Sequence, residues 1–250
     1  MTDGVDTLKW RSMKENLTLE TGTLSSEQKL ALDLCDSGEN VFLTGGAGFI
    51  GSHLVDALLS QGYDVIVLDD MSTGQISNLQ SDTIEIYNTD VTRGALGIAG
   101  LIEGSECVFH LAAKTSVQES LDSPSLYTKT NVVGTSTMLE ACRLAGVNKF
   151  VFSSTSAVYG NTESFPTAED VSPAPISPYA LSKLIGERYC KFYSELYGIS
   201  TISLRYFNVY GPRVNPKSSY RSVLPLFIDQ FSKGLPLTIT NDGNQARDFV

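Results

Sequence analysis

Short apolar runs alternate with longer amphipathic segments from residue 40 to about residue 205. The runs are rich in β-branched and aromatic residues, as in strands that are buried on both faces of a sheet. Expected strands cover residues 40–44, 64–68, 83–87, 107–111, 149–153 and 200–204, and expected helices cover 50–61, 131–145 and 178–197. This alternation predicts an α/β fold with a doubly wound parallel sheet of the Rossmann type.

The same pattern divides the chain into three parts. Residues 1–39 predict a mobile arm followed by a short capped helix near residues 26–36. Residues 40–205 form the expected nucleotide-binding domain. Residues 206–250 are punctuated by prolines and predict a small cap over the sheet edge. The elements expected in this cap are a helix near 223–233 and a strand near 237–240.

Composition excludes several classes of function. The chain has 250 residues, of which 42% are hydrophobic, so it can bury a large core. Its net charge of −10 argues against binding to nucleic acid or to an anionic membrane. No apolar run reaches the ~18 residues of a membrane helix. The first ten residues lack the apolar core of a secretory signal, so a cytoplasmic location is expected.

Metal and disulfide chemistry find little support in the sequence. His53 and His110 are the only histidines, so a site with three imidazole ligands cannot form, and no metal is expected. The four cysteines are far apart and form no CxxC pair. We therefore expect them to be small buried apolar groups rather than ligands or disulfide partners.

A glycine-rich turn follows the first expected strand and opens the first helix. Gly45, Gly48 and Gly51 are spaced by three, and Phe49 and Ile50 begin the helix. Glycine allows a tight turn and a close backbone approach to a pyrophosphate, while the helix N-terminus offers free N–H groups. The turn therefore predicts a dinucleotide site, with a purely structural glycine turn as the alternative.

Residues 24–48 also resemble the segment that leads into the P-loop of superfamily-one helicases. That family continues with Gly-Lys-Ser/Thr, whereas Ser52 and His53 stand at those places here. The phosphate-binding lysine is therefore missing, and no Walker-type chemistry is expected. This resemblance leaves open whether the first 40 residues have an evolutionary origin separate from that of the rest of the chain.

Acidic residues at the ends of the next strands favour NAD. Asp69 ends the second strand, where a carboxylate can accept both hydroxyls of the adenosine ribose and repel a 2′-phosphate. Asp70 can share this role or cap the following turn. Asp90 and Val91 follow the third strand and are candidates for an adenine contact, with a solvated loop acid as the alternative.

Tyr179 and Lys183 are the candidate catalytic pair. Their i, i+4 spacing puts both side chains on one face of the helix expected at 178–197, which Ser177 can cap. A phenol is a poor base at neutral pH, and a nearby ammonium favours the phenolate. The hydroxyl-rich residues 153–156 end the fifth strand and can contact the same reacting oxygen.

The chain carries several motifs in a fixed order: TGGAGFIG (44–51), Asp69, HLAA (110–113), SSTSAVYG (153–160), Tyr179-x-x-x-Lys183 and LRYFNVYGPR (204–213). Together they resemble the extended short-chain dehydrogenases/reductases, and within that family the NAD-dependent nucleotide-sugar epimerases. The resemblance implies NAD as the cofactor and a nucleotide sugar, with UDP as the nucleotide, as the substrate. It also implies epimerisation at C4 through a 4-keto sugar.

The same resemblance assigns roles to residues of this chain. Thr155, Tyr179 and Lys183 correspond to the catalytic set. The family pattern places Leu111, Ala112, Ala113 and Asn131 at the cofactor. It places Thr155, Asn208, Arg221 and Arg247 at the substrate, where Arg is suited to a diphosphate because its planar fork binds two oxygens. For Arg247 the alternative is a surface ion pair with Asp242 or Asp248.

Two departures from related enzymes refine these expectations. Ser156 and Ala157 occupy the places where related dehydratases and decarboxylases carry acidic residues, which favours plain epimerisation. The family continues beyond the RDFV with which this sequence ends, so we expect an incomplete substrate cap and weak binding of the nucleotide sugar. An NAD-binding scaffold without turnover is the alternative function, followed by a dehydratase or reductase of the same fold.

The resemblance also implies a homodimer in which two long helices of each subunit form a four-helix bundle. Apolar residues on the helices expected at 131–145 and 178–197 exceed what one sheet-facing stripe requires. The residues concerned are Val132, Val133, Met138, Leu139, Leu181, Leu184, Ile185, Tyr189 and Phe192.

Overall fold

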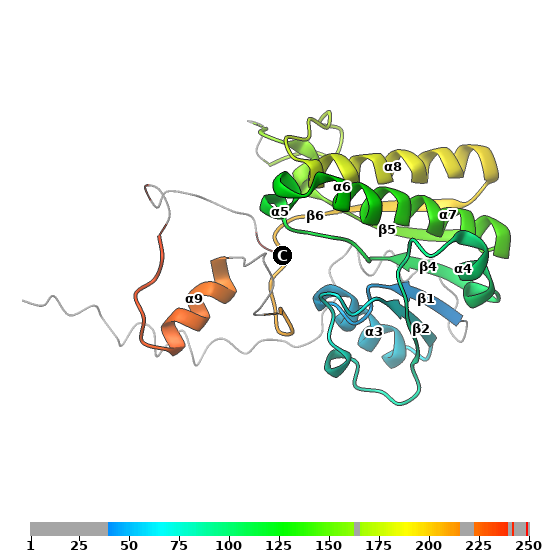
Figure 1. The fold of residues 1–250 in the computed structure, drawn as a ribbon, viewed down its shortest axis with the longest axis horizontal. Coiled ribbons are helices and arrows are strands. Elements are labelled where there is room, and N and C mark those ends of the chain that lie inside the picture. The colour runs from blue at the N-terminus through cyan, green and yellow to red at the C-terminus, as the bar shows by residue number, and fades with distance from the viewer. Residues whose placement is uncertain (1–39, 163–165, 216–222, 240–241, 243–248, 250) are drawn as a thin grey trace, which may run out of the picture.

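A computed structural model describes residues 40–162, 166–215, 223–239, 242 and 249 (Figure 1). These residues form a six-stranded parallel sheet with the order β3-β2-β1-β4-β5-β6. The strands are β1 (Asn40–Thr44), β2 (Asp64–Asp69), β3 (Glu85–Asn88), β4 (Ser105–His110), β5 (Lys149–Thr155) and β6 (Ser200–Tyr206). The strand order reverses between β1 and β4, and ligands bind at such a switch point in open α/β sheets. The predicted fold class is confirmed.

Helices cover both faces of the sheet (Figure 1). They are α3 (Phe49–Ser60), α4 (Ala95–Ile102), α5 (Val117–Asp122), α6 (Pro124–Tyr127), α7 (Gly134–Ala145), α8 (Pro178–Tyr197) and α9 (Val223–Ser232). Shorter turns are η1 (Ile76–Asn78), the π-helical η2 (Thr128–Val133) and η3 (Ser156–Tyr159). Helices α7 and α8 lie side by side on one face, and α3 lies on the other.

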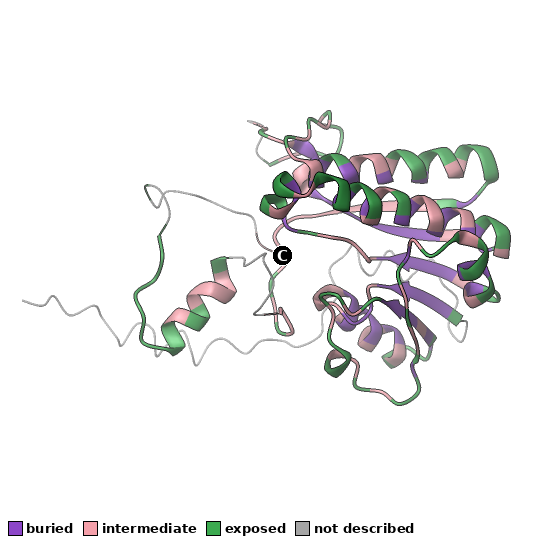
Figure 2. Cartoon of the chain, in the orientation of Figure 1, coloured by how far each residue is buried: buried purple, intermediate pink, exposed green. Residues whose placement is uncertain are grey.

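Alternate residues of the central strands serve two separate cores. Phe42, Val108 and Phe150 belong to the core under α4, α7 and α8. Leu43, Phe109 and Val151 belong to the core under α3. The middle strands are therefore buried on both sides (Figure 2), which explains why their sequences are continuously apolar rather than alternating.

Most predicted elements are present with shifted ends. Helix α8 matches its predicted range of 178–197, because the Ser177 hydroxyl accepts from the Ala180 N–H and Gly198 ends the helix at φ 72°. The helix predicted at 131–145 begins as the π-helical η2, and regular α-helix starts only at Gly134. Helices α4, α5 and α6 were not predicted, since two are short and α4 is rich in glycine.

Three expectations need correction or lie outside the described residues. Residues 237–239 form no strand, so the strand predicted near 237–240 is wrong over the part of it that is described. Met138 and Leu139 are fully buried in the core rather than on an outer face, so they cannot belong to a dimer contact. The helix predicted near 26–36 lies in the segment 1–39, outside the described residues.

The remaining expectations concern thiols, metals and membranes. Cys107, Cys142 and Cys190 are buried free thiols, as predicted, and Cys35 lies outside the described residues. Within the described part of the chain, no group of three or more His, Cys, Asp or Glu side chains is arranged to hold a metal ion. No helix in that part is long and apolar enough to cross a membrane.

Helix α8 approaches the sheet closely at one glycine. A Cβ built on Gly186 would lie 2.4 Å from Cζ of Phe152, a fully buried residue of β5. Only glycine lets the helix backbone come this near to the aromatic ring without a shift of the core. The contact sets the distance between α8, which carries Tyr179 and Lys183, and the strand that leads to Thr155.

Candidate active site

A cavity of about 1030 Å³ opens at the carboxyl ends of the strands, across the switch point between β1 and β4. Most site residues predicted from the sequence line this one cavity. They are Gly45, Gly48, Phe49, Ile50, Gly51, Asp69, Asp70, Asp90, Val91, Leu111, Ala112, Ala113, Thr155, Tyr179, Lys183 and Asn208. Residues that are far apart in sequence thus form one concave site, large enough for a dinucleotide and a small substrate.

Glycine is required at two points of the phosphate-binding turn. Gly45 has φ +74°, and a Cβ there would lie 2.7 Å from the Ala112 nitrogen. A Cβ on Gly51 would lie 2.2 Å from the carbonyl oxygen of Gly45. The turn leads into α3 at Gly48, and no described side chain caps this helix. Its first N–H groups therefore face the cavity as a site for phosphate oxygens.

Asp69 joins the glycine turn to the end of β2. Its Oδ2 accepts from the Ala47 N–H at 3.0 Å, and its Oδ1 accepts from the Met71 N–H at 2.9 Å. Burial raises the pKa of this carboxyl above its ordinary value, and the two backbone hydrogen bonds oppose that rise. Each carboxylate oxygen retains a further lone pair, so Asp69 can still accept from ribose hydroxyls.

Asp70 and Asp90 both cap turns at the edge of the cavity. The Oδ1 of Asp70 accepts from the Ser72 N–H at 2.9 Å, and the Oδ1 of Asp90 accepts from the Thr92 N–H at 2.8 Å. Both residues are exposed. The structure therefore shows the turn-capping role that was the alternative for Asp70, while both side chains also line the cavity.

A chain of buried hydrogen bonds crosses the floor of the site and fixes the tautomer of His110. The Thr135 hydroxyl donates to the Asn131 carbonyl at 2.6 Å, so it accepts from Nε2–H of His110 at 3.1 Å. The unprotonated Nδ1 then accepts from the Thr44 hydroxyl at 2.7 Å, which itself accepts from the Ala112 N–H. Burial, helped by the nearby Lys183 charge, lowers the pKa of His110 to about 3.

Asn131 lies behind the cavity wall, and its side chain holds the wall in place. Its amide accepts from the Lys114 N–H at 2.8 Å and donates to the Lys114 carbonyl at 3.0 Å. The same amide nitrogen donates to the Ser182 hydroxyl on α8 at 2.9 Å. Asn131 is 1% exposed and is not among the residues that line the cavity. Its observed partners are backbone and helix, and the predicted cofactor contact stays a prediction.

Lys183 is a buried cation on the wall of the site. It is 4% exposed, and its Nζ donates to the Ser153 carbonyl at 2.7 Å. The same atom lies 4.9 Å from the centre of the Phe152 ring, a favourable cation–π distance. Burial lowers the pKa of this ammonium to about 8, so the lysine is still mostly protonated at neutral pH.

Thr155 and Tyr179 complete the predicted catalytic set. The Thr155 hydroxyl accepts from the Ala157 N–H at 3.2 Å, which orients it at the start of η3. The Tyr179 and Tyr127 rings form a T-shaped pair with a centroid distance of 6.3 Å. Tyr127 is fully buried and donates to Glu119 at 3.0 Å. Tyr127 and Glu119 were not predicted as site residues, because neither lies in a recognisable motif.

Two further cations line the cavity wall: Lys114, which the sequence did not predict, and Arg213, which was a candidate for the substrate diphosphate. Lys114 lines the cavity, and its Nζ donates to the Ser72 hydroxyl at 3.2 Å, in the loop that follows Asp70. Arg213 also lines the cavity, but its guanidinium pairs with Asp56 on α3 at 2.6 Å. Only the proximity of two loops in the fold reveals Lys114, since 42 residues separate it from Ser72.

The predicted substrate residues are only partly described. Asn208 lines the cavity and forms an isolated parallel bridge with Phe249. Tyr210 packs edge-on against Phe249 with ring centroids 6.2 Å apart. Arg221 and Arg247 lie outside the described residues, so their predicted roles stay predictions.

The residues present fit a bound dinucleotide. The phosphate-binding turn leaves no room for a side chain at Gly45 or Gly51, and the first turn of α3 faces the cavity. The Oγ of Ser153 is buried on the cavity wall, with no hydrogen-bond partner among the described residues. Fold and site together define a dinucleotide-binding domain of the Rossmann type that carries a Thr, Tyr and Lys set.

Residues 41–250 match the model of the NAD dependent epimerase/dehydratase family, and the chain belongs to this family. The resemblance noted from the sequence motifs is thereby confirmed, and so is NAD as the cofactor. The UDP-glucose 4-epimerase of Mycolicibacterium smegmatis is 42% identical over 215 residues, which cover 83% of this chain and 68% of that protein.

Solved structures show the same relationship. The UDP-glucose 4-epimerase of Thermotoga maritima, crystallised with UDP-glucose, matches with a TM-score of 0.80 at 40% identity, covering 84% of this chain and 69% of that chain. The UDP-N-acetylglucosamine 4-epimerase of Methanobrevibacter ruminantium, in complex with UDP-N-acetylmuramic acid, matches with a TM-score of 0.82 at 38% identity. That match covers 86% of this chain and 69% of that chain.

The buried neutral His110 predicts a specific dependence of stability on pH. An unfolded histidine titrates near pH 6.5, whereas the folded pKa is about 3, so the unfolded state binds one more proton between these values. The stability contributed by this residue is present above pH 6.5 and is lost as the pH falls toward 3. Urea unfolding at pH 6.5 and 4.5 measures this loss in the wild type and in His110→Gln.

We expect the wild type to lose about 2 kcal/mol more than the variant between these two pH values. The other titrating groups are common to both proteins, so the difference between them isolates His110. Equal losses in the two proteins would mean that His110 is not held neutral.

Proposed function

We propose that the protein interconverts two nucleotide sugars by inverting the configuration at C4 of the sugar, with UDP as the nucleotide. The observation that carries this proposal is that one cavity is lined both by the glycine-rich phosphate-binding turn and by Thr155, Tyr179 and Lys183. The relatives named above are UDP-sugar 4-epimerases, which supports the substrate class.

The chain's own residues move the proton and position the sugar. Tyr179 takes the proton of the 4-hydroxyl and later returns it, and the buried Lys183 ammonium favours the phenolate that this step requires. The Thr155 hydroxyl hydrogen-bonds to the reacting oxygen. NAD, when bound, supplies the hydride acceptor and donor. Loss of the hydride makes C4 a trigonal carbonyl carbon. A 4-keto sugar that turns about its diphosphate can then take the hydride back on the opposite face, which inverts C4.

The distribution of carboxylates argues against a dehydratase. Elimination needs a carboxylic acid beside the sugar, next to Thr155. The described carboxylates that line the cavity are Asp69, Asp70 and Asp90. Asp69 ends β2, and the other two follow β2 and β3, so all three lie on the far side of the switch point. Ser156 and Ala157, which follow Thr155, also line the cavity and carry no acid.

We place the substrate diphosphate near Asn208, with Arg221 and Arg247 as the cations that bind it. Asn208 faces the cavity and pairs with Phe249, which is two residues from Arg247 in the sequence. Arg213 is a poorer candidate, because its guanidinium already donates hydrogen bonds to Asp56 and to the Ser52 carbonyl.

We also propose that the protein is a homodimer through the outer faces of η2, α7 and α8. Val133, Leu181 and Phe192 are large apolar residues on this surface with 44%, 48% and 55% of their area exposed. Such an accumulation of exposed apolar side chains is typical of a protein interface. A cytoplasmic location stays a prediction from the sequence.

Light scattering tests the dimer. We expect twice the mass of one chain at micromolar concentration, and a shift to monomer in the double variant Leu181→Glu, Phe192→Glu. The control is Leu96→Glu on α4, which changes a leucine that is more exposed than Leu181 and lies outside this surface. A monomeric wild type, or a control that dissociates as readily, would contradict the interface.

Product analysis tests the reaction. The protein is incubated with UDP-glucose and with UDP-N-acetylglucosamine, and the C4 epimers are separated. We expect epimer formation with at least one of the two, and a loss of about 10²–10⁴ in rate for Tyr179→Phe, which removes only the phenolic proton carrier. NAD content and thermal unfolding serve as controls that the variant is folded and loaded. Full activity of this variant would show that another residue is the base.

A further inference from the structure

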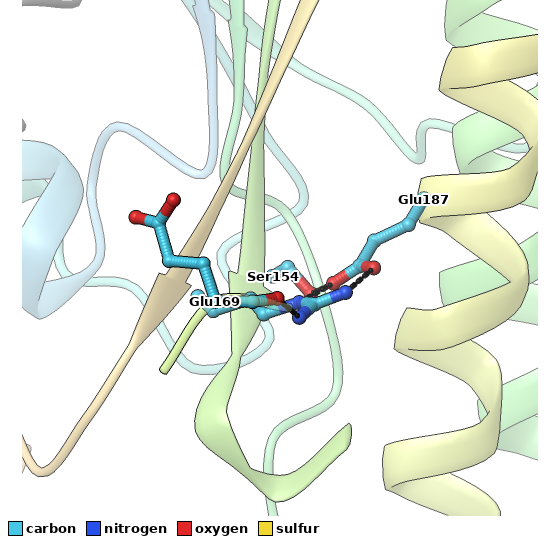
Figure 3. Close-up of polar contacts among 4 residues, drawn as sticks. Ser154, Glu169 and Glu187 are labelled. Atoms are coloured by element: carbon cyan, nitrogen blue, oxygen red, sulfur yellow. Dashed lines mark hydrogen bonds and ion pairs between the residues drawn. The ribbon is translucent and has the colours of Figure 1, made fainter. Parts of the chain in front are cut away.

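An ion pair between Arg205 on β6 and Glu187 on α8 lies beside the catalytic end of the sheet (Figure 3). The guanidinium binds both carboxylate oxygens, with Nε donating to Oε1 at 2.9 Å and Nη2 donating to Oε2 at 2.8 Å. The two side chains are only 22% and 11% exposed. This bidentate geometry fixes direction as well as distance between a strand and a helix.

The pair also holds the strand that ends in Thr155. The Ser154 hydroxyl donates to Oε1 of Glu187 at 2.5 Å, and Ser154 lies opposite Arg205 in the β5–β6 register. The preceding residue, Ser153, accepts the hydrogen bond from Lys183. Two successive residues of β5 are therefore tied to two residues of α8 that are one helical turn apart.

Arg205 reaches two further segments next to the cavity. Its Nη1 donates to the Glu169 carbonyl at 3.2 Å, and its Cζ lies 4.8 Å from the centre of the Tyr159 ring. Tyr159 ends η3, which begins immediately after Thr155, and it lines the cavity. One guanidinium thus contacts the helix, the η3 turn and the loop at Glu169.

We propose that Arg205 and Glu187 are positioning residues that set the distance between the Thr155 hydroxyl and the Tyr179–Lys183 face of α8 during the proposed epimerase reaction. The inference rests on the proposed function for its kinetic readout. Neither side chain is among the residues that line the cavity, so the pair acts through Ser154, Tyr159 and the helix rather than on the substrate.

Stability alone is a poor explanation for this arrangement. A partly buried ion pair recovers little free energy compared with an apolar pair of the same volume, because both charges are desolvated. Its advantage is a fixed relative orientation of the groups that it joins. Reacting groups that are displaced by about 1 Å can lose about 100-fold in rate, so such orientation matters at this end of the strand.

The chain offers a matched control at the opposite, amino-terminal end of the strands in the same sheet. Lys149 and Glu106 form an ion pair between the first residue of β5 and the second residue of β4. The side chains are 32% and 17% exposed, a burial similar to that of the Arg205–Glu187 pair. Loss of this second pair should weaken strand contacts without changing the carboxyl ends of the strands.

The experiment compares Glu187→Gln, Arg205→Lys and the control Glu106→Gln in the NAD-loaded protein. We expect both test variants to lower kcat about 10- to 100-fold, with KM for the nucleotide sugar changed less than twofold. The control should keep wild-type kcat. Arg205→Lys keeps the charge but loses the fork, so its loss shows that geometry rather than charge is required.

A second readout does not depend on turnover. Amide hydrogen exchange of residues 153–159 and 178–183 should be faster in Glu187→Gln and Arg205→Lys and unchanged in Glu106→Gln. If the wild type shows no epimerase activity, the proposed function fails, while exchange still decides the positioning role. Unchanged exchange in both segments, or equal loss of kcat in the control, would overturn the inference.

Discussion

The burial of the Lys183 ammonium is the constraint on which the site depends. Among the described residues no carboxylate forms an ion pair with it, and its charge is stabilised by the Ser153 carbonyl and the face of the Phe152 ring. Both partners belong to β5, so α8 must lie close to this strand. Gly186 makes that approach possible, because a side chain there would collide with Phe152. The position of Tyr179, one turn before Lys183, follows from the same contact.

The buried Lys183 ammonium also limits the charge that neighbouring side chains can carry. His110 lies near enough for the Lys183 charge to lower its pKa, and a second positive charge in the same buried space would be unfavourable. The neutral imidazole instead joins Thr44, at the glycine turn, to Thr135 on α7. The cofactor side and the catalytic side of the cavity are thus connected by hydrogen bonds that need no net charge.

The sequence was sufficient for features that depend on local spacing. The three glycines, the acid that ends β2 and the Tyr179–Lys183 pair were predictable, because each follows from the geometry of one turn, strand or helix. Long-range partners were not predictable in this way. Lys114 meets Ser72, and Arg205 meets Glu187, only because distant segments fold together, and no motif marks these pairs. The π-helical start of the segment before α7 was missed as well, since its residues have ordinary helical spacing.

Direct titration of Lys183 tests this account at its central point. In protein labelled with ¹³C and ¹⁵N in lysine, with Lys183→Met used to assign the signal, the Nζ and Cε shifts can be followed from pH 6 to pH 11. We predict a midpoint near the pKa of about 8 that burial imposes, separate from the exposed lysines near 10.4. A midpoint at or above 10 would show that the ammonium is solvated or paired with a carboxylate, and would contradict the arrangement of α8 on β5 described above.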